Sequence, residues 1–309
     1  MMENEIDREL LEKIADMLGK PVGAFNIRKD SGCDGRQSTE HIEITGKTDG
    51  KSGIDIRVKD GTVGETCHIP VIITKPGIEE MVYNDFYIGE NCDVNIVAGC
   101  GIHNCGDQAS RHDGVHTFYV GKNSHVKYTE KHYGEGDGKG GKIMNPQTVV
   151  YLEEGASVTL ETSQIRGVDD TKRYTRAECN GTHSEIVIRE KLLTHGGQHA
   201  VSEMDVFLNG ADTKTQVISR SVAQDCSSQI FYPRVQGNNL CFGHVQCDAI
   251  LMGNAKVRAI PEITCNHVDA SLIHEAAIGR IAGDQILKLM TLGLSAQEAE
   301  EKILEGFLR

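Results

Sequence analysis

The chain has 309 residues and a net charge of −13, and 39% of its residues are hydrophobic but only 5% aromatic. Nucleic-acid-binding proteins of this size carry a basic face, which this acidic sequence lacks. No apolar run reaches the ~20 residues of a membrane span, and the acidic start is unlike a signal peptide. These features exclude nucleic-acid and membrane partners and predict a cytoplasmic protein.

The first segment, Glu3 to Gly19, has apolar residues at steps of three and four, which predicts a helix that ends before Pro21. Residues 20–40 are polar and irregular, and we expect a linker there. From His41 to Val58 apolar and polar residues alternate, as in half-buried strands.

Two stretches look like phosphate-binding loops but lack required residues. Gly46-Lys47-Thr48 has His41 where the motif needs its first glycine, and Gly138-Lys139 is not followed by Ser or Thr. The sequence therefore predicts that this chain binds no nucleotide.

A strand–turn–strand unit recurs from about residue 67. Matching positions Ile88, Val120 and Leu152 are 32 residues apart, and weaker copies occur at Leu208 and Leu251. Such repeats predict a solenoid of the β-helix type, and the alternative is a sandwich or jelly roll. No helical pattern separates the strands, which argues against an α/β fold.

Two charged segments between the repeats are expected at the surface. Residues 133–141 alternate glycine with charged residues, which predicts a mobile loop. Residues 130–132 (Glu-Lys-His) could line a site, but a solvated strand face is favoured.

The C-terminal part is predicted to be helical. Residues 283–292 form one apolar pattern that ends at Gly293, and Ser295 with Glu298 forms a capping box for a second helix. Two short helices cannot bury both faces alone, so we expect them to pack on the sheet or on a partner.

Ten cysteines in a chain with no export signal are expected to be reduced and available for metal binding or catalysis. The strongest group is Cys247, Cys265, His274 and Glu275, whose donors suit iron–sulfur clusters, zinc or copper(I). Further sulfur ligands are available from Cys226 and Cys241. The alternative is that Cys265 is a core residue and Glu275 caps the next helix. A nucleophilic pair of Cys247 with His244 or His274 lacks a supporting motif.

A second candidate metal site is a C-x4-C-x6-H-x3-H array that runs from Cys100 to His116 and has His103 inside it. Its spacing suits zinc, although its central gap is about half that of a zinc finger. It would make the protein a zinc-dependent enzyme or a structural zinc protein, and a metal-free adaptor is a third alternative. The array consists of Cys100, Cys105, His112 and His116.

The C-terminal third resembles the core of the SufB/SufD family, and the repeat region resembles it more loosely. The matching motifs are Gln246-Cys247-Asp248-Ala249, Ile260-Pro261-Glu262, His274-Glu275-Ala276, Asp284-Gln285, Leu292-Gly293-Leu294-Ser295 and Glu305-Gly306-Phe307. The His-Glu-Ala motif makes the chain more similar to SufB than to SufD. It resembles the short SufB-like proteins of minimal systems, because most of the N-terminal region of longer SufB proteins is missing.

The resemblance implies a right-handed parallel β-helix with short helical segments at both ends. We expect an N-terminal helix and small strand region at 1–66, the β-helix at 67–277 and a helical segment at 278–309 that docks a SufC-like ABC-type ATPase. The implied role is a non-enzymatic scaffold for a transient iron–sulfur cluster on Cys247, assisted by His274 and Glu275. A homodimer and downstream apo iron–sulfur proteins are the other implied partners.

Overall fold

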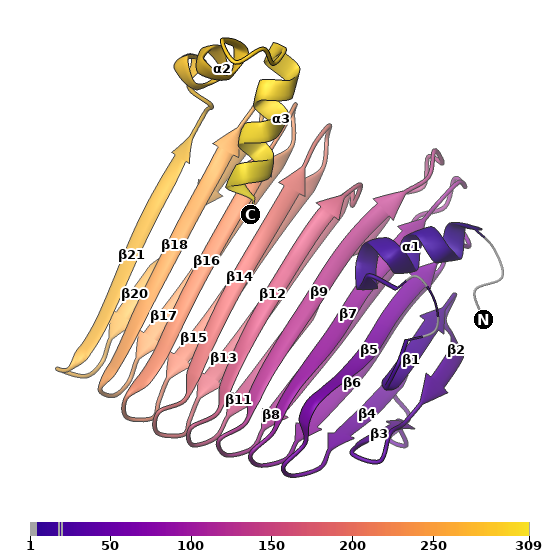
Figure 1. Cartoon of the computed structure of the whole chain (residues 1–309), viewed down its shortest axis with the longest axis vertical. Coiled ribbons are helices and arrows are strands. Elements are labelled where there is room, and N and C mark those ends of the chain that lie inside the picture. Colours follow the sequence, from indigo (N-terminus) through magenta and orange to yellow (C-terminus); the bar gives the residue numbers. More distant parts are fainter. Residues whose placement is uncertain (1–4, 18, 20, 309) are drawn as a thin grey trace.

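The computed structural model describes residues 5–17, 19 and 21–308. Within this range the chain winds into a β-solenoid made of two facing sheets, and consecutive strands mostly alternate between the two (Figure 1). The prediction of a parallel β-helix is confirmed. The ten-stranded sheet consists, in spatial order, of β2 (Gly32–Gln37), β1 (Ala24–Lys29), β5 (Val63–Ile73), β7 (Asp93–His103), β9 (His125–Glu135), β12 (Ser157–Arg166), β14 (Glu185–Thr194), β16 (Thr213–Ala223), β18 (Cys241–Leu251) and β21 (Ala270–Gly279).

The facing sheet has eleven strands, two pairs of which share one level of the stack. It consists of β3 (Ile42–Gly46), β4 (Gly53–Val58), β6 (Glu79–Ile88), β8 (Ser110–Val120), β10 (Lys142–Met144) with β11 (Gln147–Leu152), β13 (Asp170–Cys179), β15 (His199–Leu208), β17 (Ser228–Gly237), and β19 (Lys256–Ala259) with β20 (Glu262–Cys265). Three helices complete the fold: α1 (Glu5–Ala15), α2 (Gly283–Met290) and α3 (Ala296–Phe307).

The 32-residue repeat is the register of the stack. Ile88, Val120 and Leu152 are direct neighbours on β6, β8 and β11. Leu208 continues this column, but Leu251 belongs to the other sheet and pairs with Ala223. Side chains alternate along each strand, so every second residue enters the core between the sheets.

Like side chains therefore stack along the solenoid on both faces of the sheet. On the inner face, the rings of Phe86 and Phe118 stack at 4.2 Å. On the outer face, Tyr87, Tyr119 and Tyr151 form a stack at 5.2 and 5.4 Å.

The N-terminal end departs from the expected linker. Residues 24–37 form the antiparallel β1–β2 hairpin, and β1 pairs in parallel with β5. Burial of Ala24 and Phe25 against neighbouring strands explains why this polar segment is ordered. The first helix is α1, which ends at Ala15 rather than at the expected Gly19. Residues 3, 4 and 18 of the expected segment lie outside the described residues.

Helix α1 lies on the outer face of β7 and β9 (Figure 1), where Leu10, Leu11 and Ile14 are buried. Helices α2 and α3 follow β21 at the far end of the solenoid, and the predicted capping box at Ser295 and Glu298 is present. The domain boundaries expected at residues 66 and 277 fall within β5 and β21. No helix in the described part of the chain is long and apolar enough to cross a membrane.

Candidate functional site

Cys247 and His274 lie together on the inner face of the last two strands of the ten-stranded sheet. Cys247 is on β18 and pairs in register with Ala276, while His274 on β21 pairs with Val245. Their side chains meet diagonally, with 3.4 Å between Cys247 Sγ and His274 Nε2. A thiol and an imidazole at this separation are two donors suited to iron.

Glu275 does not share this face. It directly follows His274 on the strand, so its side chain points to the opposite side of the sheet. There its carboxylate lies 3.3 Å from Nε2 of His244, and the Glu275 side chain is 64% exposed. The sheet thus carries a thiol–imidazole pair inside and an imidazole–carboxylate pair outside.

The other predicted cysteines lie away from Cys247. Cys241 is the first residue of β18, six residues before Cys247, and Cys265 is the register neighbour of Gly237. A Cβ atom at Gly237 would lie 2.8 Å from Cys241 Sγ, which brings Cys241 and Cys265 to the same turn region. Cys226 is exposed in the turn between β16 and β17. All ten cysteines are free thiols.

Burial controls the protonation of the inner pair. It raises the pKa of Cys247 to about 12, and the charges of Glu190 and Asp248 act in the same direction. Burial also lowers the pKa of His274, with a contribution from His244. At neutral pH the pair is therefore a thiol beside a neutral imidazole, and any metal ion would have to displace the thiol proton to bind.

A buried ionic network fills the core between Cys247 and the N-terminal half. Arg173 donates a hydrogen bond of 2.6 Å to Glu130, and its Nε lies 3.7 Å from Glu190. Glu190 also accepts hydrogen bonds from Ser202 and Ser219. Ser219 is the register neighbour of Cys247, so the network reaches the thiol.

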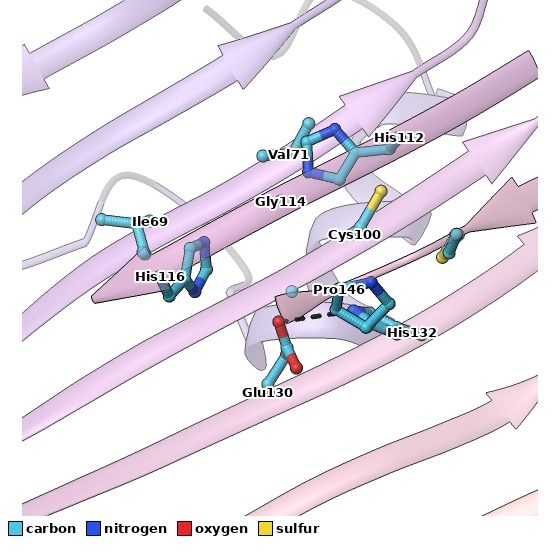
Figure 2. Close-up of a pocket in the computed structure, with 11 residues that line it drawn as sticks. Ile69, Val71, Cys100, His112, Gly114, His116, Glu130, His132 and Pro146 are labelled. Carbon is cyan, nitrogen blue, oxygen red and sulfur yellow. Dashed lines mark ion pairs between the residues drawn. The ribbon is translucent and has the colours of Figure 1, made fainter. Parts of the chain in front are cut away.

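The second candidate array is brought together only in part. Cys100, His112 and His116 line one cavity, and Glu130 and His132 complete its polar wall (Figure 2). The cavity volume is about 10 Å³, which is close to the space of one water molecule. Cys105 lies outside this cavity, exposed in the loop after β7.

Most of the cavity's polar groups already have partners. His112 donates through Nδ1 to Glu80 at 2.9 Å, and His116 donates through Nδ1 to Tyr128 at 2.6 Å. Nε2 of His116 accepts from Asn84, and burial lowers the pKa of His116 to about 4. Across the described residues, no three cysteine, histidine or acidic side chains are arranged to hold a metal ion.

The expectation that Glu130 and His132 face solvent is wrong, because both are buried. The repeat holds the signal that would have found them. His132 follows Cys100 by one 32-residue period and is its register neighbour on the inner face. The spacing that relates the apolar positions Ile88, Val120 and Leu152 thus also relates polar side chains of the core.

Comparison with known proteins identifies the family. The model described as "SUF system FeS cluster assembly, SufBD core domain" matches residues 80–307. This chain belongs to the SufBD family. All the candidate residues discussed above lie within the matched span.

Curated SufBD family iron–sulfur cluster assembly proteins of archaea are similar over most of the chain. A protein of Methanothermobacter thermautotrophicus is 28% identical over 75% of this chain and 56% of its own length. One of Methanocaldococcus jannaschii is 29% identical over 97% of this chain and 96% of its own length. One of Pyrococcus horikoshii is 27% identical over 94% of this chain and 88% of its own length. This SufBD chain thus spans about half of the first relative and nearly all of the second.

Proposed function

We propose that this protein is a scaffold on which an iron–sulfur cluster is assembled and from which it is transferred. The observation that carries the proposal is the contact of 3.4 Å between Cys247 Sγ and His274 Nε2 in a SufBD-family core. Thiolate sulfur and imidazole nitrogen are both established iron ligands. Iron and sulfide are the cargo of this scaffold, and catalysis of ATP hydrolysis belongs to a partner.

Burial of Cys247 gives the site a resting and a loading state. While buried, the thiol is protonated and shielded from oxidation, since susceptibility follows thiolate character and exposure. Opening of the last strands would hydrate Cys247 and let iron replace its proton. Glu275 and His244, on the outer face of the same strands, would then offer a hard donor and a second imidazole.

A second copy of the chain is the proposed cover for the open end. Strand β21 ends its sheet, and its outer edge has no neighbour within the described residues. Unpaired strand edges favour pairing with another chain. Exposed apolar side chains cluster on these last coils: Ile263, Val268, Ile273 and Ile278.

An asparagine ladder reaches the same end of the solenoid. Each side chain donates to the one before it, with distances of 2.8, 2.7 and 2.7 Å. The last member is in the final coil, where a further strand would extend the stack. The ladder consists of Asn180, Asn209, Asn238 and Asn266. We therefore propose a homodimer joined near Cys247 and Glu275.

The C-terminal helices are the proposed docking site for a SufC-like ABC-type ATPase. No side chain of α2 is buried. Three apolar side chains on or next to α2 are exposed: Leu287 by 60%, Met290 by 42% and Leu292 by 79%. Together they form an apolar surface that the rest of the described chain leaves uncovered. ATP-driven movement of the docked subunits would strain the dimer and open the cluster site, and recipient apo-proteins would then collect the cluster in the cytoplasm.

The decisive experiment is anaerobic reconstitution of the purified chain with iron and sulfide, with and without its ATPase. The expected result is a visible chromophore with bound iron and sulfide that Cys247→Ala abolishes and His274→Ala or Glu275→Gln weakens. Cys33→Ala is the matched control, because it removes an exposed thiol on β2, at the opposite end of the ten-stranded sheet from β18 and β21.

Retention of the full chromophore by Cys247→Ala would overturn the proposal. Absence of a chromophore together with one tightly held zinc ion per chain would instead favour a zinc protein. Circular dichroism of each variant establishes that the β-helix is intact.

A further inference from the structure

A second thiol site lies on the surface at the N-terminal half of the solenoid. Cys105 Sγ is 3.0 Å from Nε2 of His103, and Nδ1 of the same imidazole is 3.2 Å from Glu135 Oε1. Cys105 is exposed, whereas the His103 and Glu135 side chains are 19% and 20% exposed. A nucleophile, a base and a group that orients the base are thus connected in series.

The carboxylate determines which imidazole nitrogen faces the thiol. An ionised carboxylate only accepts hydrogen bonds, so Nδ1 of His103 carries the proton and Nε2 presents a lone pair to Cys105. Burial disfavours the Glu135 carboxylate, but hydrogen bonds from Lys13, His103 and Tyr133 outweigh it and lower the pKa of Glu135. Nε2 is therefore ready to accept the thiol proton.

Helix α1 holds the carboxylate in place. Lys13 Nζ on α1 lies 3.2 Å from Glu135 Oε2 and donates a hydrogen bond of 2.9 Å to the Tyr133 hydroxyl. The second oxygen of Glu135 is thus occupied, which leaves Oε1 for His103. This contact gives α1 a role in the geometry of the site as well as in packing.

The loop that carries Cys105 rests on the glycine-rich segment 136–141. Gly138 and Gly140 donate backbone hydrogen bonds of 3.1 and 2.8 Å to Asn104 and Gly106. A Cβ at Gly138 would lie 2.5 Å from the carbonyl carbon of Cys105, so only glycine allows this approach. The expected mobile loop at 133–141 thus begins as the end of β9, and its remainder, 136–141, is a support that holds the loop with Cys105 in place.

We propose that Cys105 is a nucleophilic thiol, activated by His103 and Glu135, that undergoes thiol–disulfide exchange with low-molecular-weight disulfides. His103 Nε2 takes the proton of Cys105, and the thiolate sulfur attacks one sulfur of the disulfide. An S–S bond forms to Cys105 as the S–S bond of the reagent breaks. The departing thiolate takes the proton from His103, so the products are a mixed disulfide and one free thiol.

This site is independent of the proposed cluster scaffold. Five steps in the sheet separate β7, which ends at His103, from β18, which carries Cys247. At ~4.8 Å per step, the two strands are roughly 24 Å apart. Failure of either proposal would leave the other standing.

The first test is the rate of alkylation by iodoacetamide at pH 7 in the full-length protein, followed for each cysteine by peptide mass spectrometry. Cys226 is exposed in the same chain and serves as an internal control. Because the His103 imidazole lies within reach of the Cys105 proton and no such base contacts Cys226 in the described part of the chain, we expect Cys105 to react about tenfold faster than Cys226. His103→Gln should remove this advantage, and Glu135→Gln should reduce it.

The second test uses glutathione disulfide as the reagent. The mass of a glutathionyl adduct should appear on Cys105 first, and dithiothreitol should remove it. Equal rates at Cys105 and Cys226, or an unchanged rate in His103→Gln with circular dichroism like that of the parent, would overturn the proposal. Iron–sulfur reconstitution of the His103→Gln protein should be unaffected.

Discussion

Arg173 contacts both Glu130 and Glu190, the two buried carboxylates of the interior network. Its side chain is 5% exposed and lies between Glu130 and Glu190, at 2.6 and 3.7 Å. Its Nη2 also lies 3.2 Å from Nδ1 of His132. The substitution Arg173→Met keeps most of the side-chain volume and removes the charge, so two carboxylates remain in the core without their cation.

The expected cost follows from this burial. Removing one partner of a buried ion pair costs about 3–5 kcal/mol, because the other charge stays desolvated. For a chain of this length, at about 2 °C per kcal/mol, the thermal midpoint should fall by roughly 6–10 °C. Arg176→Met is the matched control on the same strand. Arg176 pairs with Glu178 at the surface and is 37% exposed, so its loss should cost about 1 kcal/mol or less.

The pH dependence distinguishes this mechanism from a simple packing defect. In the parent, burial opposes ionisation of Glu130, but His132 and Arg173 hold its pKa well below the usual range. Without Arg173, burial should raise the folded-state pKa of Glu130 above its unfolded value. The loss of stability in Arg173→Met, relative to the parent, should then be largest at pH 7.5. It should shrink as the pH falls toward 5, because the Glu130 carboxylate takes up a proton.

The assay is thermal unfolding followed by circular dichroism at pH 7.5, 6.5 and 5.5 for the parent, Arg173→Met and Arg176→Met. A loss in Arg173→Met no greater than that in Arg176→Met would refute the reasoning. A large loss that is the same at every pH would show that the side chain acts through packing rather than charge.

Three further outcomes can be measured by urea or thermal unfolding. Gly138→Ala should lose about 1–3 kcal/mol because its Cβ would lie 2.4 Å from the Gly106 backbone, whereas Gly141→Ala, whose nearest contact is 3.9 Å, should be close to neutral. Burial holds His116 neutral by lowering its pKa to about 4, so the folded protein loses stability as the pH falls from about 6.5 toward 4. In that range His116→Gln should reduce the slope of the free energy of unfolding against pH by up to ~1.4 kcal/mol per pH unit. Asn209→Ala removes two side-chain links of the asparagine ladder and should cost about 1–2 kcal/mol, with no loss if the ladder adds nothing to stability.

The 32-residue period of the sequence predicts much of the architecture. A 32-residue spacing of apolar strand positions is enough to predict stacked coils, because each coil must place its inner side chains on those of the coil before. The structure bears this out, because Ile88, Val120 and Leu152 are neighbours on adjacent strands of the stack. The C-terminal helices were likewise predictable from local signals such as the capping box at Ser295.

The N-terminal hairpin was not predictable in this way. Residues 24–37 carry few strand signals, and their order comes from pairing with β5, which lies about 40 residues further along the chain. Tertiary contacts of this kind override weak local propensity. The glycine-rich segment 136–141 is a similar case, because its backbone approach to the Cys105 loop exists only in the stacked structure.

The sequence alone determined the repeat, the family resemblance and the residue types that can bind iron or sulfur. The tertiary structure decided which of them meet. His274 and Glu275 are neighbours in sequence but face opposite sides of the sheet, and Cys100 and Cys105 lie in a buried cavity and on the surface respectively. The physical reason is that a strand reverses its face at every residue, while contacts across the stack depend on a register set many residues away.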